Sequence, residues 1–125
     1  GDQDIDLLMR HGVVAMQSGQ LAVADATFSD IITVRPKFSE AWNKRATVRY
    51  FMGKLDDSIT DCAQVLVLEA RHYGAMSGLG LILLARNDKA GAIRWFERAL
   101  AVNPHMAVLR DKIGTLRKEL NGRPI

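Results

Sequence analysis

The sequence has one cysteine, few aromatic residues and no long apolar run, and each shortage excludes a class of protein. Cys62 is alone, so no disulfide can form within the chain, and the redox compartment is not defined. No apolar run approaches the length of a membrane span, and no secretory signal opens the sequence. Aromatic residues are 6% of the chain, so a core must be built mostly from Ala, Leu, Val and Ile.

The 125 residues are enough for one domain with a modest core, and 48% apolar with 25% charged residues is ordinary for a soluble globular protein. The chain opens with Gly1-Asp2 rather than Met. We therefore expect a domain excised from a longer protein, with any targeting segment outside this stretch.

The net charge of +3 lies in the last segment of the chain. From His105 onward, five basic residues stand against two acidic ones: Arg110, Lys112, Arg117, Lys118 and Arg123 against Asp111 and Glu119. This pattern favours a solvated helix face. RNA binding through these side chains is an alternative, but no aromatic residues are interleaved with them to stack on bases.

A small residue recurs in one column at a spacing of 34: Gly12, Ala46, Gly80 and Gly114. A second column, in the following helix, holds Phe28, Cys62 and Phe96. Antiparallel helices pack closely where small residues meet, and a bulky partner fills the adjacent space. The period therefore predicts a stacked array of helical hairpins.

Apolar spacing and turn residues predict seven helices, at about residues 5–17, 21–34, 39–52, 55–68, 73–86, 89–102 and 106–120. Gly19, Gly53 and Asn87 are expected at the turns within the hairpins. Pro36 and Pro104 end two helices, and Ser39 is a plausible capping residue.

These columns resemble the tetratricopeptide repeat family over nearly the whole chain. The middle repeat matches best, with Trp42, Ala46, Gly53 and Ser58 at the family's aromatic, glycine, turn and alanine positions. Leu8 and Met76 replace the aromatic residue in the flanking repeats. The resemblance implies an all-α fold, a right-handed α-solenoid of three helix-turn-helix repeats at about 5–38, 39–72 and 73–106. A capping helix at about 106–121 completes it.

The resemblance also implies function, because domains similar to this one are protein-binding scaffolds whose first helices line a concave groove. The positions that carry over here are the predicted groove residues: Asp6, Met9, Arg10, Val13, Met16, Gln17, Glu40, Asn43, Lys44, Thr47, Tyr50, Phe51, Gly74, Ser77, Gly78, Leu81, Leu84 and Ala85.

One subfamily binds the acidic C-terminal tails of heat-shock chaperones through a clamp of Lys, Asn and Arg. The five clamp positions here would be Met9, Val13, Lys44, Gly74 and Gly78. One is basic and none is Asn, so we expect no binding of chaperone tails.

The predicted groove is mostly apolar, with an aromatic pair at Tyr50 and Phe51 and adaptable side chains at Met9 and Met16. Such surfaces suit an amphipathic helix or a hydrophobic peptide of another protein. Gly74 and Gly78 would let a ligand backbone approach closely. The same surface could instead join two copies into a dimer, or be covered by flanking segments of a longer protein.

Two phrases, AWNKRATVRYFMGK and HYGAMSGLGLILL, look similar to a subgroup of these repeats in bacterial proteins and plant organelles. That likeness favours a bacterial or plastid adaptor, soluble and intracellular or organellar, with a regulatory domain that docks on a soluble enzyme or assembly.

Catalysis is not supported by the sequence. His11, His72 and His105 fall in different columns without metal-ligand spacing, and His11 lies among apolar neighbours as a packing residue. Asp56, Asp57 and Asp61 open a helix, where acidic residues favour the positive helix end. No glycine-rich phosphate loop is present. We therefore expect no enzyme activity, no cofactor and no metal, and we expect Cys62 to be a small buried apolar residue.

Overall fold

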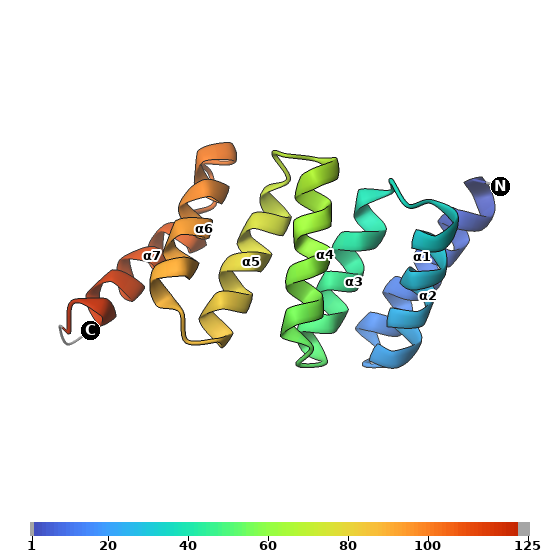
Figure 1. The fold of residues 1–125 in the computed structure, drawn as a ribbon, viewed down its shortest axis with the longest axis horizontal. Coiled ribbons are helices and arrows are strands. Elements are labelled where there is room, and N and C mark those ends of the chain that lie inside the picture. Colours follow the sequence, from blue (N-terminus) through green and yellow to red (C-terminus); the bar gives the residue numbers. More distant parts are fainter. Residues whose placement is uncertain (1, 123–125) are drawn as a thin grey trace. The chain divides into compact units, whose positions relative to one another are not determined.

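A computed structural model describes residues 2–122 of the chain, which form seven α-helices and no strand (Figure 1). The helices are α1 (Asp2–Gln17), α2 (Leu21–Val34), α3 (Ser39–Phe51), α4 (Leu55–Leu68), α5 (Tyr73–Ala85), α6 (Lys89–Val102) and α7 (Ala107–Leu120). The predicted all-α fold is confirmed, with helix ends within a few residues of the expected positions. None of the described helices combines the length and hydropathy needed to cross a membrane.

The 34-residue period is reproduced in the helix ends. The helices α2, α4 and α6 begin 34 residues apart and end 34 residues apart, at Val34, Leu68 and Val102. The end at Leu68 comes without a proline, because Ala70 stands in the column of Pro36 and Pro104. The hairpin packing, rather than the proline alone, therefore sets where these helices stop.

The turns within the hairpins follow the expected chemistry. Gly19, Gly53 and Asn87 have backbone φ angles of 78°, 76° and 64°, in the left-handed region that glycine and asparagine tolerate. The expected cap at Ser39 is wrong, since Phe38 holds the cap position and no side chain bonds to the helix end. Ser39 instead lies buried as the first residue of α3.

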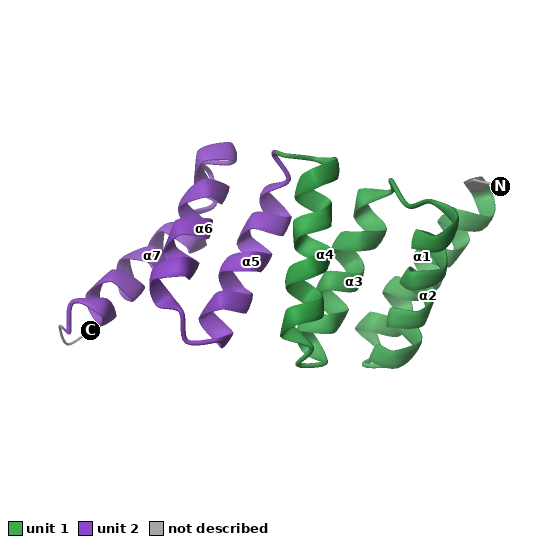
Figure 2. Ribbon diagram, viewed as in Figure 1, with its two compact units in different colours: residues 1–70 green, residues 71–125 purple. Residues whose placement is uncertain are grey.

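The chain divides into two compact units (Figure 2), unit 1 of residues 1–70 with α1–α4 and unit 2 of residues 71–125 with α5–α7. The boundary lies close to the predicted start of the third repeat. The expectation of a single domain stays a prediction, and we describe each unit by itself.

In unit 1, α1 packs on α2, α2 on α3 and α3 on α4. Phe28, Ile31, Val48 and Val65 are fully buried. A Cβ atom placed on Gly12 would lie 2.6 Å from the Phe28 ring, closer than carbon atoms can approach. The predicted pairing of a small and a bulky column is thus present between α1 and α2.

Unit 2 repeats this pairing between α5 and α6. A Cβ atom on Gly80 would collide with the fully buried ring of Phe96. The last helix, α7, packs on α6 through a single buried stripe of Leu109, Ile113 and Leu116. Leu120, one turn beyond Leu116, is half exposed at the helix end.

Candidate functional site

In unit 1, α1 supplies a half-buried apolar strip to the predicted groove. Met9, Val13 and Met16 lie one helical turn apart, and all three pack in part against the core of the unit. Arg10 and Gln17, on the same side of α1, are exposed. The strip is therefore a partly covered apolar floor with polar side chains at its margin.

The same side of α3 carries the aromatic pair. The rings of Tyr50 and Phe51 meet edge to face with centroids 5.5 Å apart, and Phe51 is 63% exposed. Glu40, Asn43 and Lys44 are half-buried along this helix face. Thr47 is exposed, and its hydroxyl donates to the carbonyl of Asn43. An exposed phenylalanine packed on a half-buried tyrosine, in a chain with so few aromatic residues, is a candidate binding anchor.

In unit 2, the predicted groove residues lie on α5. Gly74, Ser77, Gly78 and Leu84 are half-buried, and Leu81 is 37% exposed. Leu84 lines a hollow of about 390 Å³, which we call the α7 hollow because its other walls come from that helix: Val108, Asp111, Lys112, Thr115, Leu116 and Glu119. Val108 is 74% exposed at its edge.

The sequence interpretation did not include these α7 residues, because it treated α7 as a cap. The 34-residue period could have found them, since Asp111 lies in the column of Met9, Asn43 and Ser77. The last helix is thus built both as an end piece and as a wall of the candidate site.

The glycine at position 74 is explained by the helix cap beside it. The Nδ1 atom of His72 caps α5 by accepting a hydrogen bond from the backbone nitrogen of Ala75 at 2.9 Å. A Cβ atom on Gly74 would lie 3.0 Å from the His72 ring. The glycine therefore makes room for the capping imidazole, whereas close approach of a ligand at Gly74 and Gly78 stays a prediction.

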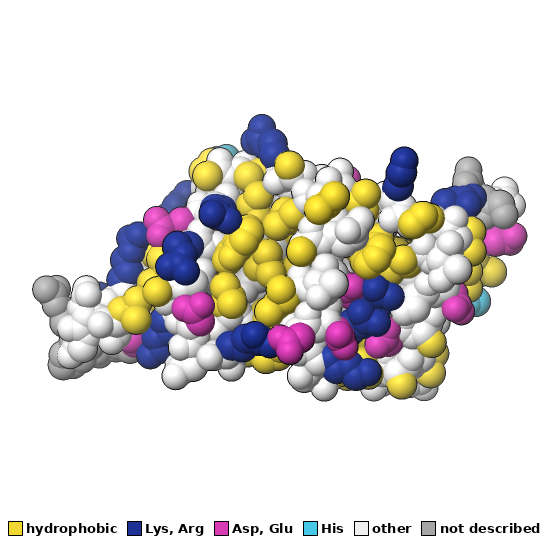
Figure 3. Space-filling view, viewed as in Figure 1, with side chains coloured by type: hydrophobic (Ala, Val, Ile, Leu, Met, Phe, Trp, Pro, Cys, Tyr) yellow, Lys and Arg dark blue, Asp and Glu magenta, His cyan; other side chains and the backbone are white. Residues whose placement is uncertain are grey.

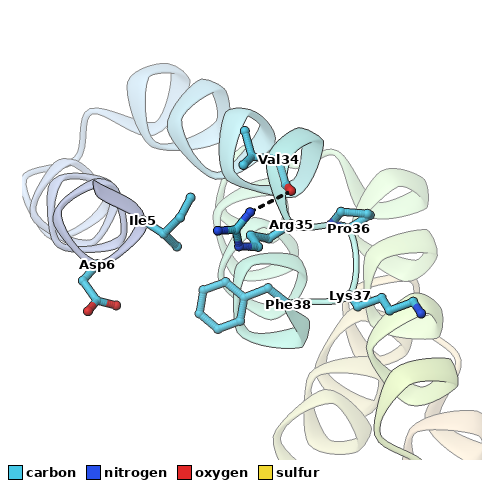
Figure 4. Close-up of a pocket in the computed structure, with 7 residues that line it drawn as sticks. All are labelled: Ile5, Asp6, Val34, Arg35, Pro36, Lys37 and Phe38. Carbon is cyan, nitrogen blue, oxygen red and sulfur yellow. Dashed lines mark hydrogen bonds between the residues drawn. The ribbon is translucent and has the colours of Figure 1, made fainter. Parts of the chain in front are cut away.

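Unit 1 has a cavity of about 560 Å³, where the start of α1 faces the loop between α2 and α3 (Figure 4). Ile5 and Asp6 line one side of it, and residues 34–38 line the other. The indole Nε1 of Trp42 donates to the carbonyl of Pro36 at 2.9 Å, which fastens this loop to α3. The cavity walls are mainly apolar, with Ile5 and Phe38 projecting toward the space between them (Figure 4).

Unit 1 also contains a buried ion-pair cluster that the sequence analysis missed. Asp61 of α4 is fully buried and accepts bonds from Arg45 Nη2 at 2.8 Å, Arg45 Nε at 3.0 Å and Arg49 Nη1 at 3.2 Å. Arg49 also pairs with Asp25 of α2 at 3.4 Å, and Arg45 Nη1 donates to Ser29 at 3.1 Å. Two arginines and two aspartates therefore join three helices with no net charge.

The cluster has a structural explanation rather than a catalytic one. Every buried side-chain nitrogen and oxygen in the described part of the chain has a hydrogen-bond partner, so no buried polar atom of the cluster is left unsatisfied. The prediction that Asp61 lies at the start of its helix is wrong. Asp56 and Asp57 do lie in the first turn of α4, as predicted.

The cysteine and His11 of the described chain lie in different environments. Cys62 is 2% exposed, as predicted, and burial together with the neighbouring Asp61 carboxylate raises the pKa of its thiol to about 12. The thiolate is therefore scarce at neutral pH. His11 is exposed, so its expected role as a packing residue is wrong. Within residues 2–122, no three His, Cys, Asp or Glu side chains lie close enough to hold a metal ion.

Comparison with known proteins decides the family. The sequence model of the protein family described as tetratricopeptide repeat matches residues 43–107. The chain belongs to the tetratricopeptide repeat family. It is 30% identical to a TPR repeat-containing protein of Rhizobium etli over 98% of its own length and 60% of that protein's. It is also 30% identical to tetratricopeptide repeat protein 36 of Mus musculus, over 90% of this chain and 71% of the relative.

The fold of this chain is also similar to solved structures of tetratricopeptide repeat domains. One is the first TPR domain of Spaghetti (RPAP3) bound to an HSP90 peptide, with a TM-score of 0.89 and 18% identity over 97% of this chain and 96% of that one. At this identity the likeness shows the fold alone. The chain spans about 60% of the length of its Rhizobium relative. Tetratricopeptide repeats are typically non-catalytic modules of protein interaction.

Proposed function

We propose that this tetratricopeptide chain is a non-catalytic scaffold that binds a helix or hydrophobic peptide of a partner protein. The main contact surface in unit 1 is the face of α1 and α3 that carries the methionine strip and the aromatic pair. The observation that supports this most is the exposed ring of Phe51, which meets the half-buried ring of Tyr50 edge to face. An exposed aromatic side chain beside a half-buried, Met-rich apolar floor suits an amphipathic segment.

In unit 2 the proposed contact surface is formed by Leu81, Leu84 and the α7 hollow. Its floor is apolar, while Asp111, Lys112 and Glu119 make a rim of mixed charge. An apolar core with a polar rim is the usual anatomy of a protein interface. The partner would be a soluble enzyme or assembly on which this domain docks as a regulatory adaptor.

Replacing Phe51 or Tyr50 with Ala should weaken partner binding by at least about tenfold, because truncating a central aromatic anchor removes a large share of the binding energy. Isothermal titration with a partner recovered by the wild-type domain would measure this. The matched control is Val67→Ala on α4, which removes an exposed apolar side chain from another helix of the same unit and should not change the affinity.

The mass of the protein in solution separates partner binding from self-association. If Phe51→Ala converts a dimer to a monomer, the surface joins two copies and the partner proposal is wrong. If Phe51→Ala binds the partner as tightly as Val67→Ala does, the aromatic pair is not the anchor.

We also propose that the predicted groove does not bind the acidic HSP90 peptide that the RPAP3 domain binds. In unit 1 the clamp positions hold the half-buried apolar side chains of Met9 and Val13, with Lys44 as the one cation. Fluorescence anisotropy with that peptide labelled should show no binding that depends on Lys44, with the RPAP3 domain as positive control. Saturable binding that Lys44→Ala abolishes would contradict the proposal.

A further inference from the structure

The two units carry opposite net charge. Residues 1–70 contain seven Lys and Arg against ten Asp and Glu, a net charge of −3. Residues 71–125 contain ten Lys and Arg against four Asp and Glu, a net charge of +6. The excess of positive charge therefore belongs to the whole of unit 2 and begins well before the last helix.

Most of the acidic groups of unit 2 are already engaged within it. Asp88 caps α6 by accepting a bond from the backbone nitrogen of Gly91 at 2.9 Å. Glu97 pairs with Arg117 at 3.1 Å, and Glu119 pairs with Lys89 at 3.1 Å. On α6 and α7, as described, five cations are left without an acidic partner: Arg94, Arg98, Arg110, Lys112 and Lys118.

Four arginines gather on one side of this helix pair. Arg94 and Arg98 lie one turn apart on α6, and Arg110 and Arg117 lie two turns apart on α7, so each pair shares a helix face. The ion pair of Arg117 with Glu97 places that face of α7 beside α6. We call these four exposed residues, with Glu97 among them, the arginine face. Figure 3 shows Lys and Arg side chains gathered over α6 and α7.

We propose that the arginine face docks an acidic segment of a partner protein. The planar guanidinium presents paired donors that match a carboxylate, and an uncompensated positive surface attracts and orients an acidic partner. The spacing of Arg94 and Arg98, one helical turn apart, matches the spacing of two carboxylates one turn apart on a partner helix. None of the four arginines is a predicted groove residue, so this surface is additional to the one in the proposed function.

The structure favours an acidic protein over a nucleic acid or a membrane. The aromatic residue beside the arginine face, Trp95, is stacked by Arg98, whose guanidinium carbon lies 4.4 Å from the ring centroid. That stacking covers a ring face that a base would need. The exposed apolar neighbours on the outer side of α6 are Ala90 and Ala101, which are too small to anchor in a bilayer.

The test is a titration of the full chain with a fluorescein-labelled glutamate-rich peptide, against a glutamine peptide of the same length. The double variant Arg94→Glu with Arg98→Glu should weaken binding by at least about tenfold. The lysine control, Lys37→Glu with Lys54→Glu, reverses two exposed lysines of unit 1 outside the predicted groove and should change it far less. Glu97→Gln should strengthen binding several-fold, since it removes the acidic group within the face and releases Arg117.

Three results would overturn the proposal. Equal losses in the lysine control and in the double variant, which change the net charge equally, would show a response to net charge alone. Tighter binding of an RNA oligonucleotide of equal charge would identify a nucleic-acid surface. An oligomer in sedimentation that the double variant dissociates would make the occupant a second copy of the chain. Phe51→Ala should leave the peptide affinity unchanged, so failure here and failure of the proposed function give different results.

Discussion

Replacing Asp61 with Ala should lower the free energy of unfolding by about 3–5 kcal/mol, because it leaves two arginines in a buried site without their shared anion. Asp61 is fully buried, and both of its carboxylate oxygens accept from Arg45, at 2.8 and 3.0 Å. Removing one partner of a buried pair costs more than the pair contributes, since the remaining charge is neither solvated nor neutralised. Urea unfolding followed by circular dichroism would measure the loss.

The matched control is Asp30→Ala, which removes an exposed aspartate of α2 outside the ion-pair cluster and should leave unfolding nearly unchanged. A second variant separates charge from packing. Asp61→Leu with Arg45→Leu removes one cation and one anion together, so it should recover much of the stability that Asp61→Ala loses, while Arg49 keeps Asp25. If Asp61→Ala unfolds at the same urea concentration as Asp30→Ala, the cluster does not stabilise unit 1.

The ion-pair cluster also shows which contacts could not be predicted from the sequence. Asp61 lies in phase with Ser58 and Val65, on the buried side of α4, so helical phase could have indicated a buried charge where the sequence analysis expected a helix-end residue. Its partners could not be assigned, because Arg45 and Arg49 come from α3 and Asp25 from α2. Which charges meet depends on how three helices pack, and the period of one helix carries no such information.

The helices, in contrast, were predictable to within a few residues because each turn is specified more than once. Small residues at one spacing, bulky residues at another and tolerant turn residues at a third all repeat every 34 positions. Agreement among these columns located α4 even though Ala70 replaces the proline. His11 shows the limit of such reasoning, since apolar neighbours in sequence did not make it buried.

The predicted groove residues were placed by helical phase; in the structure they are half-buried or exposed, and their role in binding stays a prediction. The α7 hollow was missed because the interpretation stopped the groove at the last complete hairpin. The role of Gly74 was missed because it depends on the rotamer of His72, a capping side chain outside the repeat pattern. A column pattern therefore predicts which face a residue occupies but not which neighbour its side chain meets.

Gly80→Ala and Gly114→Ala should change stability in opposite directions, although both glycines stand in one column of the repeat. At Gly80 the added methyl group would collide with the buried Phe96 ring, and such overpacking costs about 1–3 kcal/mol. At Gly114 no neighbouring atom lies within 4 Å of the added methyl group. Ala should therefore stabilise α7 by about 0.5–1 kcal/mol through its better helix propensity. Thermal unfolding of the two variants beside the wild type would measure both signs.

The middle repeat indicates how the collision at Gly80 can be relieved. There the same two columns hold Ala46 and Cys62, a larger first residue with a smaller second one, and both are buried. Phe96→Leu should therefore reduce the cost of Gly80→Ala, and the coupling energy in the double-mutant cycle should favour the combined variant. If the losses of stability in the two single variants simply add, the glycine is required by the backbone packing of α5 and not by the Phe96 ring.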